Sequence, residues 1–146
     1  MSLKRIATAI WKGTGLEGSG TMSSTSEVLS NTPYSVKTRF ENEDGKKGTN
    51  PEELIAAAHA GCFCMALSFQ LSGAGFTPEK LETEAVVNIG KEGVHWTITR
   101  IDLNLEATVD GISEAQFLEL AGNAKDGCPV SKALAAVDIQ LNAKLN

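Results

Sequence analysis

Residues 49–67 read TNPEELIAAAHAGCFCMAL. Thr49 or Asn50 can cap a helix at its start, and the two glutamates that follow the proline favour the positive end of the helix dipole. The pattern predicts a helix over residues 51–72, ended by the glycines and the proline of residues 73–78. Because apolar or small side chains occur on every side of its central turns, we expect this helix to be long, central and buried.

The other elements follow from changes in the spacing of apolar residues. A spacing of two predicts strands, and a spacing of three to four predicts helices. The resulting order of three strands, a helix, two strands, a helix and a strand indicates an α+β fold, with antiparallel sheets wrapped around the long helix. Strands are expected over residues 4–11, 21–29, 33–40, 81–89, 94–109 and 137–145, a second helix over residues 113–127, and a short helical turn after Pro129.

Length and charge limit the classes of function. A chain of 146 residues is long enough for one domain with a buried core, and we expect a single domain over residues 1–146. It comprises N-terminal strands (1–40), a charged, glycine-punctuated loop (41–48) and a helix-containing part (49–146). The formal net charge of -5 and a pI near 5.0 make nucleic acid and anionic membranes poor partners.

Two observations bear on the cellular compartment. The apolar run over residues 6–11 is too short for the core of a signal peptide, and no later run approaches the ~20 apolar residues of a membrane span. The three cysteines are an odd number, which does not suit a framework of structural disulfides. We therefore expect a cytoplasmic protein whose thiols are mostly reduced.

Residues 13–18 read GTGLEG, which has the spelling of the dinucleotide-binding fingerprint. That fingerprint needs a following helix whose N-terminus holds the pyrophosphate, whereas the residues that follow here are β-like and rich in serine and threonine. We expect a hairpin turn at this position and no bound cofactor.

The strand predicted over residues 94–109 changes phase. Its apolar residues up to Ile98 share one face, whereas those from Ile101 onwards would lie on the opposite face. A β-bulge or bend near residues 99–100 would restore a single buried face.

Three thiols are candidates for chemistry: Cys62 and Cys64 in the long helix, and Cys128 before Pro129. Cys62 and Cys64 are about 200° apart around a regular helix, so they cannot chelate one metal, and we expect no metal site. A cysteine among alanines in mid-helix is most simply a packing residue. Unpaired amides and the helix dipole lower a thiol pKa just before a first helical turn, so the residues alone favour Cys128 as the nucleophile.

Four motifs stand in a fixed order along the chain: GTNPEELI (48–55), AAHAGCF (57–63), GFTP (75–78) and AKDGCPVS (124–131). Together they resemble the OsmC branch of the OsmC/Ohr family of thiol-dependent peroxidases. The likeness extends through residues 33–34, 38–40 and 111–112, and so covers nearly the whole chain. Its most specific part is a glutamate-led helix with a buried cysteine, combined with a distant Cys-Pro.

The resemblance implies an intertwined homodimer that reduces organic or lipid hydroperoxides to alcohols without a metal or bound cofactor, in defence against oxidative and osmotic stress. By position, Cys62 matches the family's peroxidatic cysteine, Cys128 its resolving cysteine, Arg39 the arginine that holds the thiolate, and Glu52 the glutamate paired with that arginine. These roles reverse the order of the two thiols that the residues alone favour. An external dithiol would reopen the disulfide between Cys62 and Cys128, and the family points towards lipoylated proteins as that dithiol.

Two residues depart from the family pattern. Cys64 falls where close relatives carry serine, and His59 falls where the Ohr branch has tyrosine, so we expect neither to be required.

Two other functions stay open. His59 lies one turn before Cys62 and could serve a thiol-imidazole hydrolase, although a mid-helix position offers no evident oxyanion hole. The other alternative is a non-enzymatic dimeric module that binds small apolar ligands.

The helix also carries an inference about assembly. Glu52 and Cys62 are ten residues apart, which is ~15 Å of rise, so Glu52 cannot touch the Cys62 of its own chain. Either Arg39 bridges part of that gap or Glu52 comes from a partner whose helix crosses antiparallel, and we favour the second. Two-fold packing of the helices would place each site at the dimer interface.

Because burial alone raises a thiol pKa, Cys62 needs a nearby cation, for which Arg39 is the candidate.

Overall fold

The computed structural model describes residues 2–42 and 45–146. The chain forms two compact units, one that extends to Leu54 and one that runs from Ile55 to Asn146. The single domain with internal boundaries after residues 40 and 48 stays a prediction. Residues 43 and 44 of the predicted charged loop lie outside the described residues.

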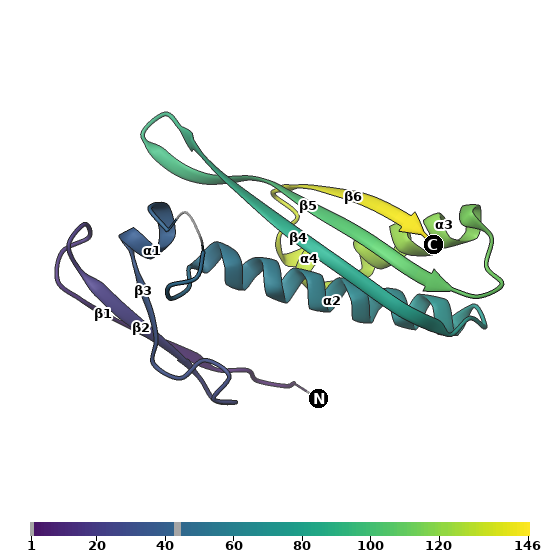
Figure 1. Cartoon of the computed structure of the whole chain (residues 1–146), viewed down its shortest axis with the longest axis horizontal. Helices are drawn as coiled ribbons and strands as arrows, with labels where there is room; N and C mark the ends of the chain where they lie inside the picture. The colour runs from purple at the N-terminus through teal and green to yellow at the C-terminus, as the bar shows by residue number, and fades with distance from the viewer. Residues whose placement is uncertain (1, 43–44) are drawn as a thin grey trace. The chain divides into compact units, whose positions relative to one another are not determined.

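The first unit contains a small antiparallel sheet in the order β1-β2-β3 (Figure 1). β1 (Ala7–Lys12) and β2 (Ser19–Ser24) form a hairpin, and β3 (Thr32–Ser35) pairs with the other edge of β2. The turn of the hairpin starts with Gly13 at φ +92°, a conformation that glycine adopts without steric cost. The hairpin turn predicted over residues 13–18 is confirmed. The strand predicted over residues 21–29 is wrong in its second half, because β2 starts at Ser19 and ends at Ser24.

The strand predicted over residues 33–40 is wrong in its second half, because β3 ends at Ser35 and a short helix, α1 (Val36–Phe40), follows. The Ser35 hydroxyl accepts a hydrogen bond from the Thr38 amide at 3.1 Å, and the Thr38 hydroxyl accepts one from the Ser35 amide at 2.8 Å. This capping box satisfies backbone groups at the helix start. The alternation of apolar residues does not reveal such a local preference.

The long helix α2 runs from Pro51 to Gly73, one residue beyond its predicted end. The Asn50 side chain accepts a hydrogen bond from the Glu53 amide at 2.8 Å and so caps the helix. Beyond the helix, Gly75 has φ +89°, which lets the chain turn back on itself before the next strand.

Within the chain itself, α2 buries one face only. His59, Phe63 and Leu67, spaced four residues apart, are fully buried, whereas Met65 and Phe69 are 64% and 74% exposed. The expectation of a helix buried on all sides is therefore wrong for the chain taken alone. The described part of the chain leaves the face with Met65 and Phe69 open to solvent.

By length and composition, α2 could also cross a membrane, because its 23 residues have a mean hydropathy of 1.6 over the most apolar window. This differs from the expectation that no run in the sequence approaches a membrane span. The core helix of a protein in water passes the same test, so composition does not distinguish the two cases.

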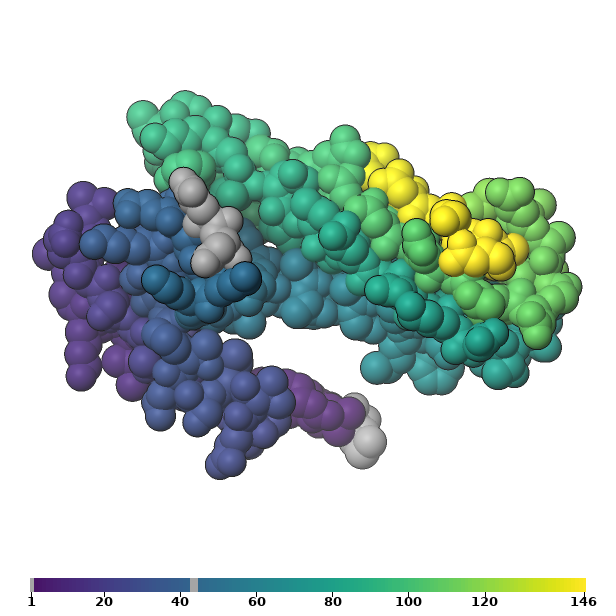
Figure 2. All heavy atoms as spheres, in the orientation of Figure 1, coloured from purple at the N-terminus to yellow at the C-terminus, as the bar shows by residue number. Residues whose placement is uncertain are grey.

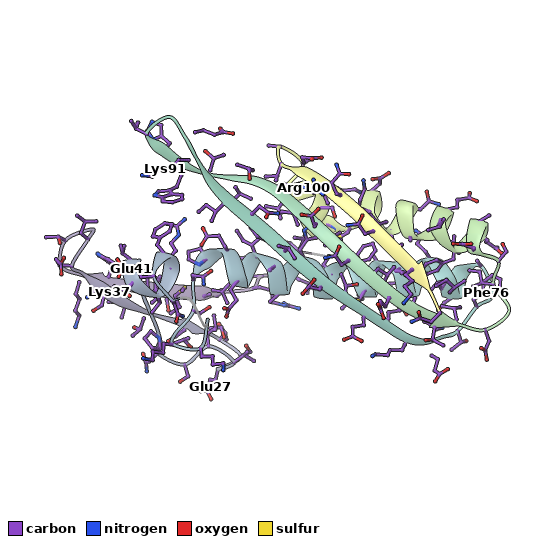
Figure 3. The ribbon with its side chains drawn as sticks, turned by 45° about the horizontal axis from the view of Figure 1, so that its top comes forward. Glu27, Lys37, Glu41, Phe76, Lys91 and Arg100 are labelled. Atoms are coloured by element: carbon purple, nitrogen blue, oxygen red, sulfur yellow. The ribbon has the colours of Figure 1, made fainter. Side chains whose placement is uncertain are left out.

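The second unit is built on a three-stranded sheet in the order β4-β5-β6. β4 (Pro78–Glu92) and β5 (His95–Val109) form a long antiparallel hairpin with Lys91 near its turn and Phe76 at the opposite end (Figure 3). The teal and green atoms of this hairpin lie beside the yellow atoms of β6 (Asp138–Leu145) in the space-filling view (Figure 2).

The predicted β-bulge is confirmed at Thr99. Asn88 of β4 pairs with Arg100, and the next residue, Ile89, pairs with Ile98, so Thr99 is the extra residue on β5. The bulge shifts the strand by one residue and brings the apolar side chains on both sides of it to one face.

The prediction of purely antiparallel sheets is wrong for β6, which pairs with β5 in parallel. The reason lies in the connection between the two strands. After β5, α3 (Glu114–Gly127) and α4 (Pro129–Ala133) carry the chain back along the sheet, so that Asp138 enters beside Arg100. Parallel neighbours need such a helical crossover, whereas a short turn would have produced an antiparallel pair.

One face of β5 carries the core of the second unit. The residues between its buried positions are more exposed, so the sheet is covered on one face only. Helices α2 and α3 pack on this face and hold the α3–α4 junction against α2. The core side chains are Phe63, Leu67, Leu71, Ile101, Leu103, Leu105, Ala107, Val109, Phe117, Ala121 and Ala124.

Candidate active site

Two of the three thiols meet where the α3–α4 junction packs on α2. The Sγ atoms of Cys62 and Cys128 are 2.9 Å apart, although 66 residues separate them in the sequence. Cys62 is half-buried on α2. Cys128 is fully buried and lies between the end of α3 and the start of α4. Both are free thiols, at a distance from which a disulfide needs only a small movement, because its bond length is ~2.05 Å.

The two thiols have opposite electrostatic surroundings. Burial raises the pKa of the Cys128 thiol, but hydrogen bonds from Cys62 and from the amides and hydroxyl at the start of α4 outweigh it, and the net pKa is lowered. Burial and the hydrogen bond with Cys128 raise the pKa of Cys62. Of the two thiols, Cys128 is therefore the one whose thiolate is favoured, next to the first turn of α4.

The structure brings Arg39 and Glu52 together in the first unit. Arg39, on α1, donates from Nε at 3.1 Å and from a terminal nitrogen at 2.6 Å to the Glu52 carboxylate at the start of α2. The Glu52 side chain is 11% exposed and the Arg39 side chain 35%. Such a two-point contact fixes the plane of the guanidinium. The roles that the resemblance implies for these two residues stay predictions.

A buried polar pair lies next to the thiols, and the sequence did not reveal it. A ring nitrogen of His59, Nε2, is 2.8 Å from the Ser131 hydroxyl oxygen, and both residues are buried. The pair joins α2 to α4 across 72 residues of sequence. The only signal in the sequence is that Ser131 follows Cys128 by three residues, which places it in the same helical turn. His59 thus bonds Ser131 rather than Cys62, which does not favour a thiol-imidazole hydrolase.

The third thiol contacts a different element. The Cys64 Sγ donates to the Thr83 hydroxyl of β4 at 3.1 Å. Cys64 therefore faces the sheet, while Cys62 faces the α3–α4 junction. This contact is that of a packing residue with a weak hydrogen bond.

An apolar cavity of about 370 Å³ opens beside Cys62. It lies between α2 and the end of α3, and the Cys62 sulfur is the reactive group in its wall. The other lining residues are Met65, Ala66, Phe69, Gln70, Ala124, Gly127 and Pro129. The described residues contain no group of three metal-ligating side chains. Thiol chemistry on an apolar molecule is what this arrangement can support.

A family model described as "OsmC-like protein" matches residues 43–142, which is more than half of the chain. The chain belongs to the OsmC-like family. It is 47% identical over 146 residues to Peroxiredoxin OsmC of Escherichia coli K12, covering 98% of this chain and 100% of that protein.

Solved structures of the same family have the same fold. The Bacillus subtilis organic hydroperoxide resistance protein OhrB is 27% identical, with a TM-score of 0.71 over 95% of this chain and 98% of that chain. An OsmC-like protein from Mycoplasma pneumoniae is 18% identical, with a TM-score of 0.76 over 99% of both chains, and this likeness bears on the fold alone. The α+β architecture predicted from the order of strands and helices, and the OsmC/Ohr-like fold that the resemblance implied, are confirmed.

The buried His59 gives this OsmC-like protein a pH-dependent stability. Burial lowers the pKa of the His59 ring below its ordinary value of 6.5, so the unfolded chain takes up the proton first as the pH falls. The contribution is complete above pH 6.5 and is lost as the pH falls below it. We expect the melting temperature to fall from pH 7.5 to pH 5.5 by more in the wild type than in His59→Phe, measured by calorimetry.

The matched control is His95→Phe, because His95 is exposed at the start of β5. Its fall in melting temperature should equal that of the wild type. Equal falls in the wild type and His59→Phe would contradict the assignment of a neutral, buried ring.

Proposed function

We propose that this protein is a thiol peroxidase that reduces organic hydroperoxides to alcohols. The observation that carries the proposal is the pair of free thiols, with sulfur atoms 2.9 Å apart, at the wall of an apolar cavity. Its relatives support it, because the E. coli protein is named a peroxiredoxin and the B. subtilis protein an organic hydroperoxide resistance protein. The free cysteines favour a cytoplasmic location, and the likeness to the OsmC/Ohr family supports a role in oxidative or osmotic stress defence.

The proposed cycle has three balanced steps. The Cys62 thiolate attacks the distal oxygen of the hydroperoxide, the O–O bond breaks, and the alcohol leaves after it takes up a proton, so that Cys62 becomes a sulfenic acid. The Cys128 sulfur then attacks the Cys62 sulfur, the S–O bond breaks, and water leaves. An external dithiol reduces the resulting disulfide by two exchange steps and is itself oxidised.

The first step needs a positive charge at Cys62. In the reduced pair, burial and the hydrogen bond with Cys128 raise the pKa of Cys62. Attack therefore requires a positively charged group that stabilises the thiolate on Cys62 rather than on Cys128. A guanidinium ~4 Å from the Cys62 sulfur stabilises its thiolate by about 4 kcal/mol at an effective dielectric of ~20. We assign this role to Arg39 of a second chain in a dimer, oriented by its two-point contact with Glu52 of that same chain.

The cavity supports an organic substrate. Met65 and Phe69 are large apolar side chains in its wall, and a volume of about 370 Å³ accommodates a small aromatic or short-chain hydroperoxide. Burying the alkyl part in such a wall contributes ~25 cal/mol per Å² of apolar surface. Hydrogen peroxide has no such surface and gains nothing from the wall.

We also propose that the chain acts as a homodimer assembled through the exposed face of α2. Met65 and Phe69 are largely exposed in the chain alone, and the space beside Gly61 is open. A contiguous exposed apolar face marks an interaction surface, and a helix with glycine and alanine on that face admits a close approach of a second helix. A second copy would cover the open side of the cavity.

The three cysteines are expected to behave differently in dithiol-dependent consumption of cumene hydroperoxide. Cys62→Ser should lose turnover by at least ~10³-fold, since it lacks the nucleophile. Cys128→Ser should complete the first turnover and fail to recycle. Cys64→Ser is the matched control on the same helix as Cys62, and its turnover should stay within about twofold of the wild type. A mass spectrum after one equivalent of peroxide should show a crosslink between Cys62 and Cys128. An inactive Cys64→Ser would refute the choice of thiol.

Phe69→Ala is expected to lower kcat/KM for cumene hydroperoxide about tenfold, because part of the buried aromatic contact, ~1.5 kcal/mol, is lost. The value for hydrogen peroxide should stay unchanged. Val94→Ala is the control, since Val94 is 86% exposed between β4 and β5. If the wild type reduced hydrogen peroxide as efficiently as cumene hydroperoxide, the role of the apolar wall would be wrong.

Light scattering should give a mass of about twice the 15.4 kDa of one chain. Gly61→Glu should place an unpaired charge in the interface and so prevent the two chains from associating. The resulting monomers should have activity lower by about tenfold or more. A side chain at Gly61 meets no atom within the chain, so the substitution does not disturb the fold of one copy. Gly122→Glu is the control, because Gly122 on α3 is equally open. A monomeric wild type with full activity would exclude the dimer.

A further inference from the structure

Two contacts join α2 to the chain around α4, and the cycle above uses only one of them. The first is the sulfur contact of Cys62 with Cys128 at 2.9 Å, and the second joins the His59 Nε2 atom to the Ser131 hydroxyl oxygen at 2.8 Å. His59 precedes Cys62 by three residues on α2, and Ser131 follows Cys128 by three residues. Residues three apart on a helix lie on the same face, about 5–6 Å from each other. The two contacts are therefore neighbours, and a shift of α4 along α2 would change both distances together.

The short helix α4 has little else to hold it in place. Of its five residues, all of which the structure describes, Ser131 alone is buried, and none belongs to the apolar core. Ser131 is 6% exposed, and its partner His59 is fully buried. A buried hydroxyl is unfavourable unless it is hydrogen-bonded, and a hydrogen bond weakens steeply away from its preferred distance and angle. The contact therefore fixes both the position and the orientation of α4 on α2.

The backbone of Cys128 is anchored on both sides. Its amide donates to the Ala124 carbonyl at 2.9 Å, and Ala124 is fully buried in the core near the end of α3. Its carbonyl accepts from the Lys132 amide at 3.0 Å, which closes the turn that carries Ser131. The core thus fixes Cys128 from the α3 side, and the contact of Ser131 with α2 fixes it from the α4 side. Loss of the second anchor would give the Cys128 sulfur more positions away from its partner.

We propose that His59 and Ser131 are positioning residues for the thiol pair: their contact holds α4 on α2, so that the Cys128 sulfur stays within reach of the Cys62 sulfur. Two groups held in the right geometry react as if one were present at a high local concentration. The contact therefore favours the disulfide over the two thiols and speeds the attack of Cys128 on the Cys62 sulfenic acid. Its importance for turnover rests on the proposed peroxidase cycle, whereas the equilibrium between thiols and disulfide does not.

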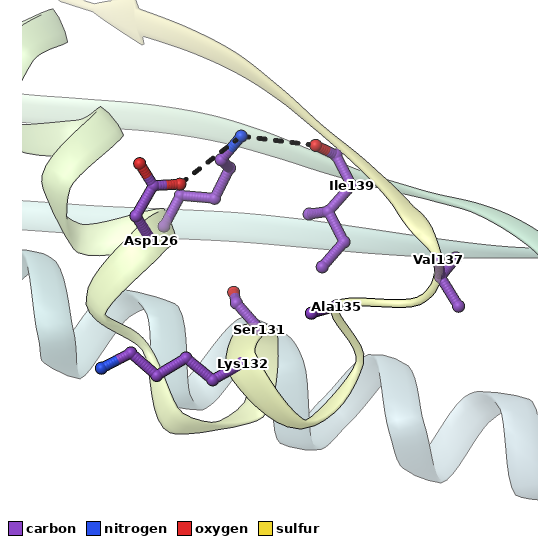
Figure 4. A pocket seen from close by; sticks show the side chains of 7 residues that line it. Asp126, Ser131, Lys132, Ala135, Val137 and Ile139 are labelled. Carbon is purple, nitrogen blue, oxygen red and sulfur yellow. Dashed lines mark hydrogen bonds and ion pairs between the residues drawn. The ribbon is translucent and has the colours of Figure 1, made fainter.

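The surroundings of the polar pair allow matched control variants. The Ser131 side chain borders a second cavity of about 290 Å³, which Lys125, Ala135 and Ile139 also line (Figure 4). This space can take one methyl group, so Ser131→Thr keeps the hydroxyl and is the control for Ser131→Ala. His59→Gln is the control for His59→Phe, because a glutamine amide can donate or accept a hydrogen bond in place of Nε2.

The test is the equilibrium between thiols and disulfide, measured in proteins that carry Cys64→Ser so that Cys62 and Cys128 are the two thiols left. Each protein is incubated with mixtures of reduced and oxidised dithiothreitol. Reduced dithiothreitol gives two electrons and two protons to the Cys62–Cys128 disulfide and closes to its own cyclic disulfide. Acid quenching, alkylation of free thiols and mass spectrometry then give the fraction of protein in the disulfide form.

His59→Phe and Ser131→Ala should each lower the equilibrium constant for disulfide formation about tenfold, which makes the reduction potential about 30 mV less negative. Ser131→Thr and His59→Gln should stay within about threefold of the parent. The double variant His59→Phe/Ser131→Ala removes both partners and leaves neither of them unsatisfied, so it separates positioning from folding. Because the two residues act through one contact, its loss should also be about tenfold rather than the product of the two single losses.

An unchanged equilibrium constant in Ser131→Ala or in the double variant would overturn the proposal, as would an equal loss in Ser131→Thr. A loss in the double variant equal to the product of the single losses would show that the residues act separately, which also contradicts it. Ser131→Ala removes one oxygen atom and keeps the proposal testable if His59→Phe does not fold. Because the measurement uses no peroxide, its outcome is independent of whether the protein is a peroxidase.

Discussion

The contact between the sulfur atoms of Cys62 and Cys128, at 2.9 Å, is the constraint on which the site depends. It requires the middle of α2 and the start of α4 to be held together, although the two segments are far apart in the sequence. The core does this, because α2 and α3 pack on one face of β5 and Cys128 directly follows the last residue of α3. The sulfur contact is therefore a product of apolar packing several residues away, and a core that loosened would separate the thiols before it lost its secondary structure.

The position of the negative charge is the second constraint. A helix start, a serine hydroxyl and the neighbouring thiol favour the thiolate on Cys128, whereas the peroxidatic role belongs to Cys62 in the proposed cycle. Both statements are compatible when a cation acts on Cys62 at the moment of attack. Arg39 is suited to this, because its contact with Glu52 already fixes the plane of its guanidinium. The balance between the two sulfurs then sets which thiol is nucleophile and which is leaving group.

One face of α2 serves both binding and assembly in this proposal. Met65 and Phe69 line the cavity beside Cys62 and are also the largest exposed apolar residues of the helix. The same surface that would hold the alkyl part of a hydroperoxide would hold the second chain. Cys64 is kept apart from both, because it faces β4 and bonds Thr83.

Local patterns in the sequence determined the long helix from Pro51, the bulge at Thr99 and the helix that opens at Ser113, because caps, alternation and helical spacing act over a few residues. They failed at α1, where a capping box outweighed alternation, and at β6, whose direction is set by a crossover rather than by its own residues. The likeness to the OsmC/Ohr family, rather than any spacing, paired Cys62 with Cys128 and Arg39 with Glu52. Tertiary structure alone decided that His59 meets Ser131 and which face of α2 stays open, since contacts across some 70 residues depend on how the core packs and no local pattern records them.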